Sequence, residues 1–166
     1  MAEASSAREN DAVLFLVFHL DRDRYAIEAA RVISVLPLVE TKAIPRAPEA
    51  VAGLFDYRGE LLPLIDLCRI ALGRAARPVL STRIIVAEYR DSAGRPRKLG
   101  LIGEQVLQTV RLAEADFQES GVDHPDTAYL GPVAADARGA LQRVRIEHLL
   151  PESLYELLFQ PRTADA

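Results

Sequence analysis

The sequence predicts a mainly β protein whose antiparallel strands close as a barrel or stack as a sandwich. Four times along the chain, an apolar run rich in strand-forming residues is followed by a short polar turn and a second such run. Three of these turns contain a glycine, which supplies the positive φ that hairpins often require. Strands that alternate regularly with helices are absent, which argues against a parallel α/β fold. The 166 residues are 49% apolar and 27% charged, as is typical of a globular domain.

Each predicted strand pair is interrupted by a polar or charged turn. The pairs are residues 13–18 with 25–27, 51–57 with 60–67, 83–87 with 98–101, and 130–134 with 141–144. The first turn is a run of alternating acidic and basic residues, and the second contains Arg58 and Gly59. Residues 28–31 predict a single helical turn between two strands.

Prolines restrict the backbone conformation around the second predicted strand pair, residues 51–57 with 60–67. Pro45 and Pro48 predict an extended or turned link between the β segments 13–41 and 51–67. Pro63 lies within a strand and removes one backbone donor. We therefore expect that strand to be an edge strand or to contain a bulge.

The C-terminal part predicts a helix that packs on the sheet. Its apolar residues recur at intervals of three and four, and they are Ile146, Leu149, Leu150, Leu154, Leu157 and Leu158. Pro151 does not fit inside a continuous helix, so we expect it to open a second helical segment. Packing on the barrel surface is favoured over insertion into a partner's groove.

Charge and cysteine content narrow the class of protein. The net charge of -4 argues against nucleic acid or an anionic membrane as the main partner, because both attract clustered basic residues. The single cysteine, Cys68, is expected to be a buried thiol. The sequence has neither a signal peptide nor the ~20 apolar residues of a membrane helix, so we expect a cytoplasmic protein. Residues 1–11 and 161–166 are expected to be flexible tails of a domain spanning 12–160.

The sequence offers little for catalysis or metal binding. His19, His124 and His148 lie far apart and lack the spacing of metal ligands on one helix. No phosphate-binding loop or serine nucleophile motif is present. We therefore expect no enzyme, no cofactor and no metal. Two remote alternatives are a small barrel enzyme that uses Asp66 or Glu60, and an RNA-binding barrel, which would need a basic face with exposed aromatic residues.

The segment 53–67 combines a hairpin with charged residues at its turn. Arg58 lies at the turn, with Asp56 and Glu60 close to it. One interpretation is a solvated turn whose ion pairs contribute little to stability. The other is an interface anchor, because a guanidinium on a stiff hairpin makes several directed hydrogen bonds at a modest desolvation cost. Residue chemistry alone favours the solvated turn.

The same segment resembles the central motif of the CheW family, the adaptors of bacterial chemosensory arrays. That motif reads Pro-x-x-Pro, then Val-x-Gly-Val-x-Asn-x-Arg-Gly, then Pro-Val-Ile-Asp-Leu. The matching residues here are Pro45, Pro48, Gly53, Arg58, Gly59, Pro63, Ile65, Asp66 and Leu67. The resemblance continues in order over about residues 13–150, and it includes a strand at 32–36.

The resemblance implies two small intertwined SH3-like five-stranded β-barrels around a shared core, with a short helix and a C-terminal helix. It also implies a non-catalytic adaptor that needs no cofactor. Such adaptors couple the cytoplasmic tip of methyl-accepting chemoreceptors to the regulatory domain of a CheA-type histidine kinase. They are recruited to receptor arrays at the membrane without inserting into it. Other copies of the adaptor are further candidate partners.

By this resemblance, the receptor-facing surface lies around the groove between the barrels. The residues expected there are Arg58, Asp56, Gly53, Val32, Ser34 and Ile84. Gly59, Pro63 and Asp66 are expected to shape the hairpin and its surroundings. The resemblance identifies no kinase-binding residue in this sequence.

Four positions depart from the family pattern. Asp56 replaces asparagine, Ser34 replaces an acidic residue, Gly103–Glu104 replaces Val-Asp, and Arg145 replaces aspartate. Because the first two lie in the expected receptor surface, we expect a specialised pathway, either surface-sensing (Wsp-type, with a diguanylate cyclase output) or type IV pilus. Flagellar chemotaxis is the alternative. The length predicts a stand-alone adaptor, since a fused receiver domain would add about 100–150 residues.

Overall fold

The computed structural model describes residues 11–121 and 124–159, and within them the chain forms nine β-strands. The strands are β1 (Ala12–Leu20), β2 (Asp23–Glu28), β3 (Val32–Pro37), β4 (Val51–Tyr57), β5 (Glu60–Asp66), β6 (Arg83–Arg90), β7 (Pro96–Ala113), β8 (Leu130–Asp136) and β9 (Gly139–Val144). The α-helices are α2 (Leu67–Leu72) and α3 (Glu152–Leu158). Short 3₁₀ helices are η1 (Ala29–Arg31), η2 (Glu114–Asp116), η3 (Pro125–Thr127) and η4 (Ile146–His148).

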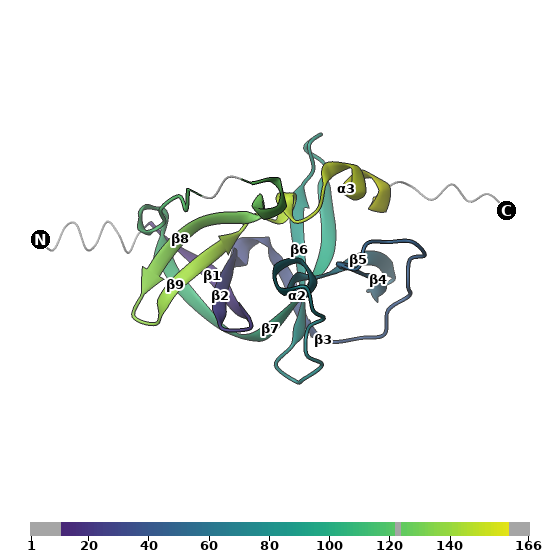
Figure 1. Ribbon diagram of the computed structural model, residues 1–166, viewed down its shortest axis with the longest axis horizontal. Coiled ribbons are helices and arrows are strands. Elements are labelled where there is room, and N and C mark those ends of the chain that lie inside the picture. The colour runs from purple at the N-terminus through teal and green to yellow at the C-terminus, as the bar shows by residue number, and fades with distance from the viewer. Residues whose placement is uncertain (1–10, 122–123, 160–166) are drawn as a thin grey trace, which may run out of the picture.

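The strands form two small barrels that share β7 (Figure 1). Barrel 1 has the order β7-β1-β2-β9-β8 and uses residues 104–113 of β7. Barrel 2 has the order β3-β6-β7-β5-β4 and uses residues 96–103. The chain begins barrel 1, builds most of barrel 2, and then returns along β7 to complete barrel 1. This path confirms the expected intertwined five-stranded barrels.

A short backbone bridge closes each barrel. In barrel 2, the N–H groups of Lys42 and Leu54 each donate to the other residue's carbonyl oxygen at 2.8 Å. In barrel 1, Gln118 and Val133 exchange the same pair of hydrogen bonds, also at 2.8 Å. Closure removes the open edges through which β-sheets aggregate.

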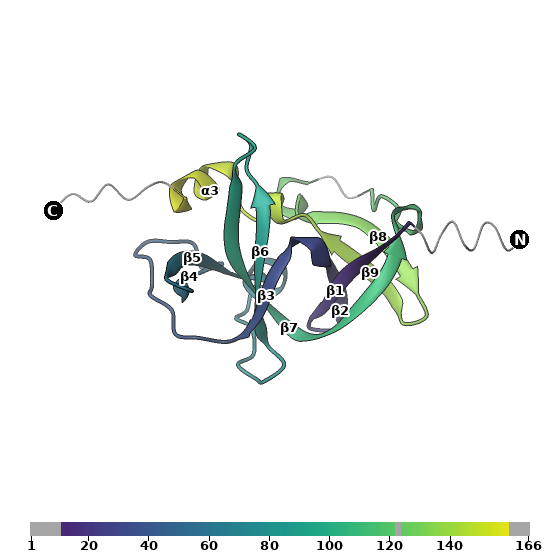
Figure 2. The same cartoon turned by 180° about the vertical axis from the view of Figure 1, so that it is seen from behind.

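One large hydrophobic cluster joins the two barrels. Phe18 and Ile27 of barrel 1 pack in the same cluster as Ile65 and Leu101 of barrel 2. Each barrel also has a smaller cluster of its own, centred on Phe15 in barrel 1 and on Phe55 and nearby residues in barrel 2. Seen from both sides, β7 runs diagonally through both halves of the molecule (Figures 1 and 2).

All four predicted hairpins are present, as β1–β2, β4–β5, β6–β7 and β8–β9. The predicted helical turn is η1, and Pro151 precedes α3 as expected. The buried thiol is also confirmed, since Cys68 is fully buried. The predicted tails lie outside the described residues, apart from Asp11.

The β4–β5 pair is irregular near Pro63, as expected: its register shifts between Val51 and Gly53, and β7 pairs only with Leu64–Asp66, which leaves Pro63 unpaired on that side. Two expectations need correction. The strand predicted over residues 60–67 ends at Asp66, and Leu67 begins α2, because the carboxylate of Asp66 caps a helix there. Leu157 points away from the barrel and is 65% exposed.

Gly53 lies where the linker bridge meets β4, and its φ is +135°. A Cβ at this position would overlap the backbone carbonyl of Lys42, which is one half of the bridge that closes barrel 2. Gly139 has a φ of +110°, but a Cβ there would meet nothing within 4 Å. Gly53 is therefore required by both conformation and close approach, and Gly139 by conformation alone.

We predict that Gly53→Ala destabilises the protein more than Gly139→Ala. Strain at a positive φ costs about 1–3 kcal/mol in either variant, and only Gly53→Ala adds the overlap with Lys42. Urea unfolding measures the loss of unfolding free energy in each variant. Equal losses in the two variants would mean that the Lys42–Leu54 bridge shifts to accept the Cβ without further destabilisation.

Candidate functional site

The β4–β5 hairpin ends in a two-residue turn formed by Arg58 and Gly59. Their φ angles are +51° and +86°, as in the type I′ turn whose twist matches that of the flanking strands. The first position of this turn favours asparagine, aspartate or glycine. An arginine there occupies a conformation that is sparsely populated by residues with a Cβ, and such strain is common at functional sites.

Asp56 fixes the turn from the end of β4. Its Oδ1 accepts a hydrogen bond from the Gly59 N–H at 2.8 Å. The amide oxygen of an asparagine would accept the same bond. The turn therefore needs the oxygen of Asp56 but not its negative charge.

The Arg58 side chain is exposed above the ring of Tyr57, with its guanidinium carbon 5.3 Å from the ring centroid. Within residues 11–121 and 124–159 it has no hydrogen-bond or ion-pair partner. The nearby Glu60 is 3.3 Å from Lys98 of β7 instead. Leu61, opposite Asp56 in the strand register, is 54% exposed. We call Asp56, Arg58 and Leu61 the hairpin patch.

The other residues expected in the receptor-facing surface divide into two groups. Val32 and Ser34 are half-buried on β3, which β6 and β7 separate from β5. Ile84 is fully buried in the core of barrel 2, and Gly53 is buried beneath the linker. Ile84 and Gly53 therefore support the fold and are not available as surface contacts, which corrects the expectation for both.

The three residues expected to shape this region have identifiable roles. Gly59 supplies the second positive φ of the turn, and Pro63 is buried in β5. The Oδ1 of Asp66 accepts from the Cys68 N–H at 2.9 Å, which caps α2, and its Oδ2 accepts from the Ala76 N–H at 2.9 Å. Asp66 thus ties the start of α2 to the segment that follows it.

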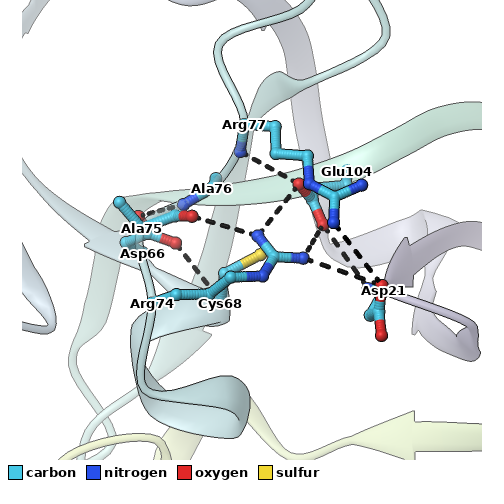
Figure 3. Close-up of polar contacts among 8 residues, drawn as sticks. All are labelled: Asp21, Asp66, Cys68, Arg74, Ala75, Ala76, Arg77 and Glu104. Atoms are coloured by element: carbon cyan, nitrogen blue, oxygen red, sulfur yellow. Dashed lines mark hydrogen bonds and ion pairs between the residues drawn. The ribbon is translucent and has the colours of Figure 1, made fainter.

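A buried carboxylate, Glu104, lies where β7 passes from one barrel to the other (Figure 3). Its side chain is 9% exposed. Arg74 donates to Oε1 at 2.9 Å and to Oε2 at 3.3 Å, and the Arg77 N–H donates at 2.9 Å. The Asp21 N–H, from the β1–β2 turn, donates at 3.4 Å. Glu104 therefore joins the β1–β2 turn of barrel 1 to the α2–β6 loop that belongs to barrel 2.

The electrostatics of Glu104 follow from these contacts. Burial by itself would raise the pKa of this carboxyl group. The hydrogen bonds from Arg74, Arg77 and Asp21 and the charge of Arg74 outweigh burial and lower the pKa from 4.5 to about 2. The carboxylate is thus charged at neutral pH and holds the α2–β6 loop in place.

The departures from the family pattern have local explanations at two further positions. A Cβ at residue 103 would lie 3.0 Å from the ring of Phe18, so Gly103 makes room for that buried ring. Arg145 forms an ion pair with Glu119 at 3.4 Å. Nothing in the structure explains Ser34.

A cavity of about 920 Å³ lies between the β6–β7 hairpin, η4 and α3. Its walls include Tyr89, Tyr155 and Phe159, together with charged residues of both signs. No expected site residue lines it. Within the described residues, no group of three or more histidine, cysteine or acidic side chains is arranged to hold a metal, and no helix has the length and apolarity needed to cross a membrane.

The chain is similar to known proteins over most of its length. The family model of the CheW-like domain matches residues 14–153. The chemotaxis protein CheW of Helicobacter pylori is 28% identical over 119 residues, which cover 70% of this chain and 68% of the relative. That of Rhizobium meliloti is 24% identical over 128 residues, or 77% of each chain. The scaffolding protein TtCheW of Thermoanaerobacter tengcongensis has a similar fold, with a TM-score of 0.72, 23% identity, and coverage of 84% of this chain and 88% of that one.

We predict that Glu104 makes the stability of the protein sensitive to acid. Because its pKa is lower in the folded state, its contribution is fully present above pH 4.5 and is lost as the pH falls from 4.5 towards 2. A fall of this size corresponds to roughly 3 kcal/mol. The difference in unfolding free energy between the wild type and Glu104→Gln should be near that value at pH 7.

Urea unfolding of both proteins between pH 7 and pH 3 tests this. Taking the difference cancels the effect of Asp136, whose pKa is also lowered to about 2, chiefly by its hydrogen bond with Arg24. If the difference in unfolding free energy between the wild type and Glu104→Gln stays constant with pH, Glu104 acts through packing and not through charge.

Proposed function

The chain belongs to the CheW-like domain family, and on that premise we propose that it is a non-catalytic adaptor coupling chemoreceptors to a CheA-type histidine kinase. Its position in such an array is at the cytoplasmic face of the membrane, held there by its partners. The proposal needs no cofactor and no reaction at the protein itself.

The observation that carries the proposal is the conformation of Arg58. Its guanidinium is exposed and unpaired among the described residues, and it extends from a turn position that strains an arginine. The turn itself would be more stable with asparagine there, and strain of this kind is common at functional sites. An unpaired guanidinium on a stiff hairpin suits the recognition of a carboxylate or carbonyl group on a receptor helix.

The receptor-binding residues that we propose are Arg58 and Asp56 at the hairpin, with Val32 and Ser34 as the contribution of β3. Arg58 is the central residue because arginine combines a planar charge with an apolar stem, as anchors of interfaces often do. Leu61 adds apolar area directly beside it.

We further propose that the pathway is a specialised one, either surface-sensing or type IV pilus, and not flagellar chemotaxis. The support is Asp56, whose negative charge has no role in the turn and is left exposed to the partner. A receptor that accepts asparagine at this position would meet an additional charge here. Flagellar chemotaxis stays the alternative.

We predict that Arg58→Asn separates receptor binding from folding. Asparagine prefers this turn position, so the unfolding free energy should stay the same or rise slightly. Loss of the guanidinium should weaken binding to the receptor by about 2 kcal/mol, or roughly 30-fold, while binding to the kinase is unchanged.

The measurement is calorimetric titration with the soluble signalling tip of a receptor and with the regulatory domain of a CheA-type kinase, both from the same genome. Glu60→Gln on the same hairpin is the control, since its carboxylate is paired with Lys98. Receptor binding that survives in Arg58→Asn would exclude Arg58 as the anchor. If the wild type binds neither partner, the adaptor proposal itself is wrong.

A replacement experiment tests the specialised pathway. We predict that this protein does not restore swimming chemotaxis in a cell that lacks its flagellar CheW, because Asp56 adds a charge to the receptor contact. A variant carrying Asp56→Asn and Ser34→Glu should restore swimming chemotaxis to a greater extent than the unaltered protein. Full restoration by the unaltered protein would contradict the specialised assignment.

A further inference from the structure

The cavity beside α3 is formed by two parts of the chain that are far apart in the sequence. One wall is the end of the β6–β7 hairpin, and the other is formed mainly by η4 and α3. Figures 1 and 2 both show α3 beside the end of that hairpin. The volume of about 920 Å³ lies within the range of pockets that hold small organic molecules. None of the residues that we assign to receptor binding lines it, so the proposed adaptor contacts do not account for this cavity.

The apolar part of the lining is mostly aromatic. The ring centroid of Tyr89 on β6 lies 5.3 Å from that of Tyr155 and 6.0 Å from that of Phe159, and both ring pairs are tilted. Leu149 and Leu150 add aliphatic carbon to the same lining. Tilted rings offer both faces and edges to a further ring. A ligand with an aromatic body therefore fits this cavity.

A buried hydroxyl group in the lining lacks a partner. Tyr89 is 4% exposed, and its hydroxyl forms no hydrogen bond within the described residues. Buried hydroxyl groups are nearly always hydrogen-bonded, so an unpaired one needs an explanation. Burial raises the pKa of Tyr89, while the charge of Arg97 acts in the opposite direction. The phenol is therefore protonated at neutral pH, and it can donate to an acceptor that also contacts Arg97.

The hairpin wall carries more positive than negative charge. Among the residues that line the cavity, this wall has three guanidinium groups, those of Arg90, Arg95 and Arg97, and one carboxylate, Asp91. The Nε atoms of Arg95 and Arg97 share one oxygen of Asp91, at 3.1 and 3.2 Å. The terminal nitrogens of Arg97 have no partner in the part of the chain that the structure describes. Its guanidinium carbon lies 5.2 Å from the ring centroid of Phe159, which places an unsatisfied positive group beside the aromatic lining.

The acidic residues of the other wall are exposed or already paired. Glu152 and Glu156 on α3 are exposed, and so is Asp126, so water and salt weaken their field. Glu147 forms an ion pair with Arg31. The negative charge of this wall is therefore screened, whereas the positive charge of the hairpin lies next to the buried hydroxyl.

From these features we propose that the cavity binds an aromatic carboxylate. The ligand's carboxylate accepts hydrogen bonds from the hydroxyl of Tyr89 and from the terminal nitrogens of Arg97, and its ring packs against Tyr155 and Phe159. A guanidinium matches the two oxygens of a carboxylate. A phosphate would bring up to two negative charges and would be opposed more strongly by Asp91. The site is separate from the hairpin patch, so this proposal does not rest on the adaptor function.

Fluorescence titration with naphthoate tests the proposal, because the chain contains no tryptophan and the emission of the naphthalene ring can be followed directly. Naphthalenemethanol and naphthylmethylammonium, substituted at the same ring position, are the neutral and cationic analogues. Naphthoate should bind at least tenfold more tightly than either, since hydrogen bonds to a charged group are the stronger ones. Equal binding of the three compounds, tighter binding of the ammonium compound, or no binding of naphthoate at millimolar concentration overturns the proposal.

Two substitutions locate the anion. Tyr89→Phe removes only the hydroxyl group, and Arg97→Gln removes the positive charge. Each should weaken naphthoate binding roughly tenfold and leave binding of the neutral analogue unchanged. Tyr89→Phe should unfold at the same temperature as the wild type or at a higher one, because its hydroxyl has no hydrogen bond to lose among the described residues.

The control is Arg69→Gln on α2, which changes the net charge by the same amount as Arg97→Gln but lies outside the cavity. Its naphthoate binding should match that of the wild type. Unchanged binding in Tyr89→Phe or in Arg97→Gln contradicts the assigned contacts. An equal loss in Arg69→Gln would show that the net charge of the protein, and not this site, attracts the anion.

Discussion

The structure depends on one strand that belongs to two barrels and on the buried carboxylate at its crossing point. Without Glu104, β7 would still pair with strands on both sides, but the β1–β2 turn and the α2–β6 loop would lose their common partner. A buried carboxylate is tolerated only when its hydrogen bonds offset the loss of water. Here the Arg74 guanidinium and the backbone N–H groups of Arg77 and Asp21 provide them. The relative position of the two barrels therefore rests on a charged group as well as on the shared apolar core.

Rigidity at this junction matters for a protein that acts by geometry. The hairpin patch and the α2–β6 loop are carried by different parts of barrel 2, and hydrogen bonds hold each of them in place. An adaptor with fixed surfaces raises the effective concentration of one partner for another. Weak contacts can then add up in an array without any single contact being strong.

The candidate site was only partly predictable from sequence. The residues alone predicted the turn at Arg58 and Gly59, because a two-residue turn leaves little choice of conformation. Its role as an interface anchor came from the resemblance to the family, since residue chemistry by itself favoured a solvated turn. Ile84 and Gly53 were assigned to the surface by resemblance, yet the closed barrel buries both. Glu104 stood out only as a departure from a pattern, since its partner Arg74 lies 30 residues away. The exposure of Val79 and Leu80, which lie between Pro78 and Ser81, has no clear signal in the sequence, because an apolar pair is as compatible with burial as with exposure.

By itself, the sequence determined the features that depend on neighbours a few residues apart. These are the four hairpins, the helical turn after β2, the break at Pro151 and the position of Arg58 at a turn. The tertiary structure decided which side chains face inward, because that depends on closure of each barrel through the Lys42–Leu54 and Gln118–Val133 bridges. It also decided that Leu80 faces solvent, because contacts distant in the sequence hold its loop outward. Local periodicity indicates which face of an element is apolar, but not which segments cover that face, since those segments are brought together only by the fold.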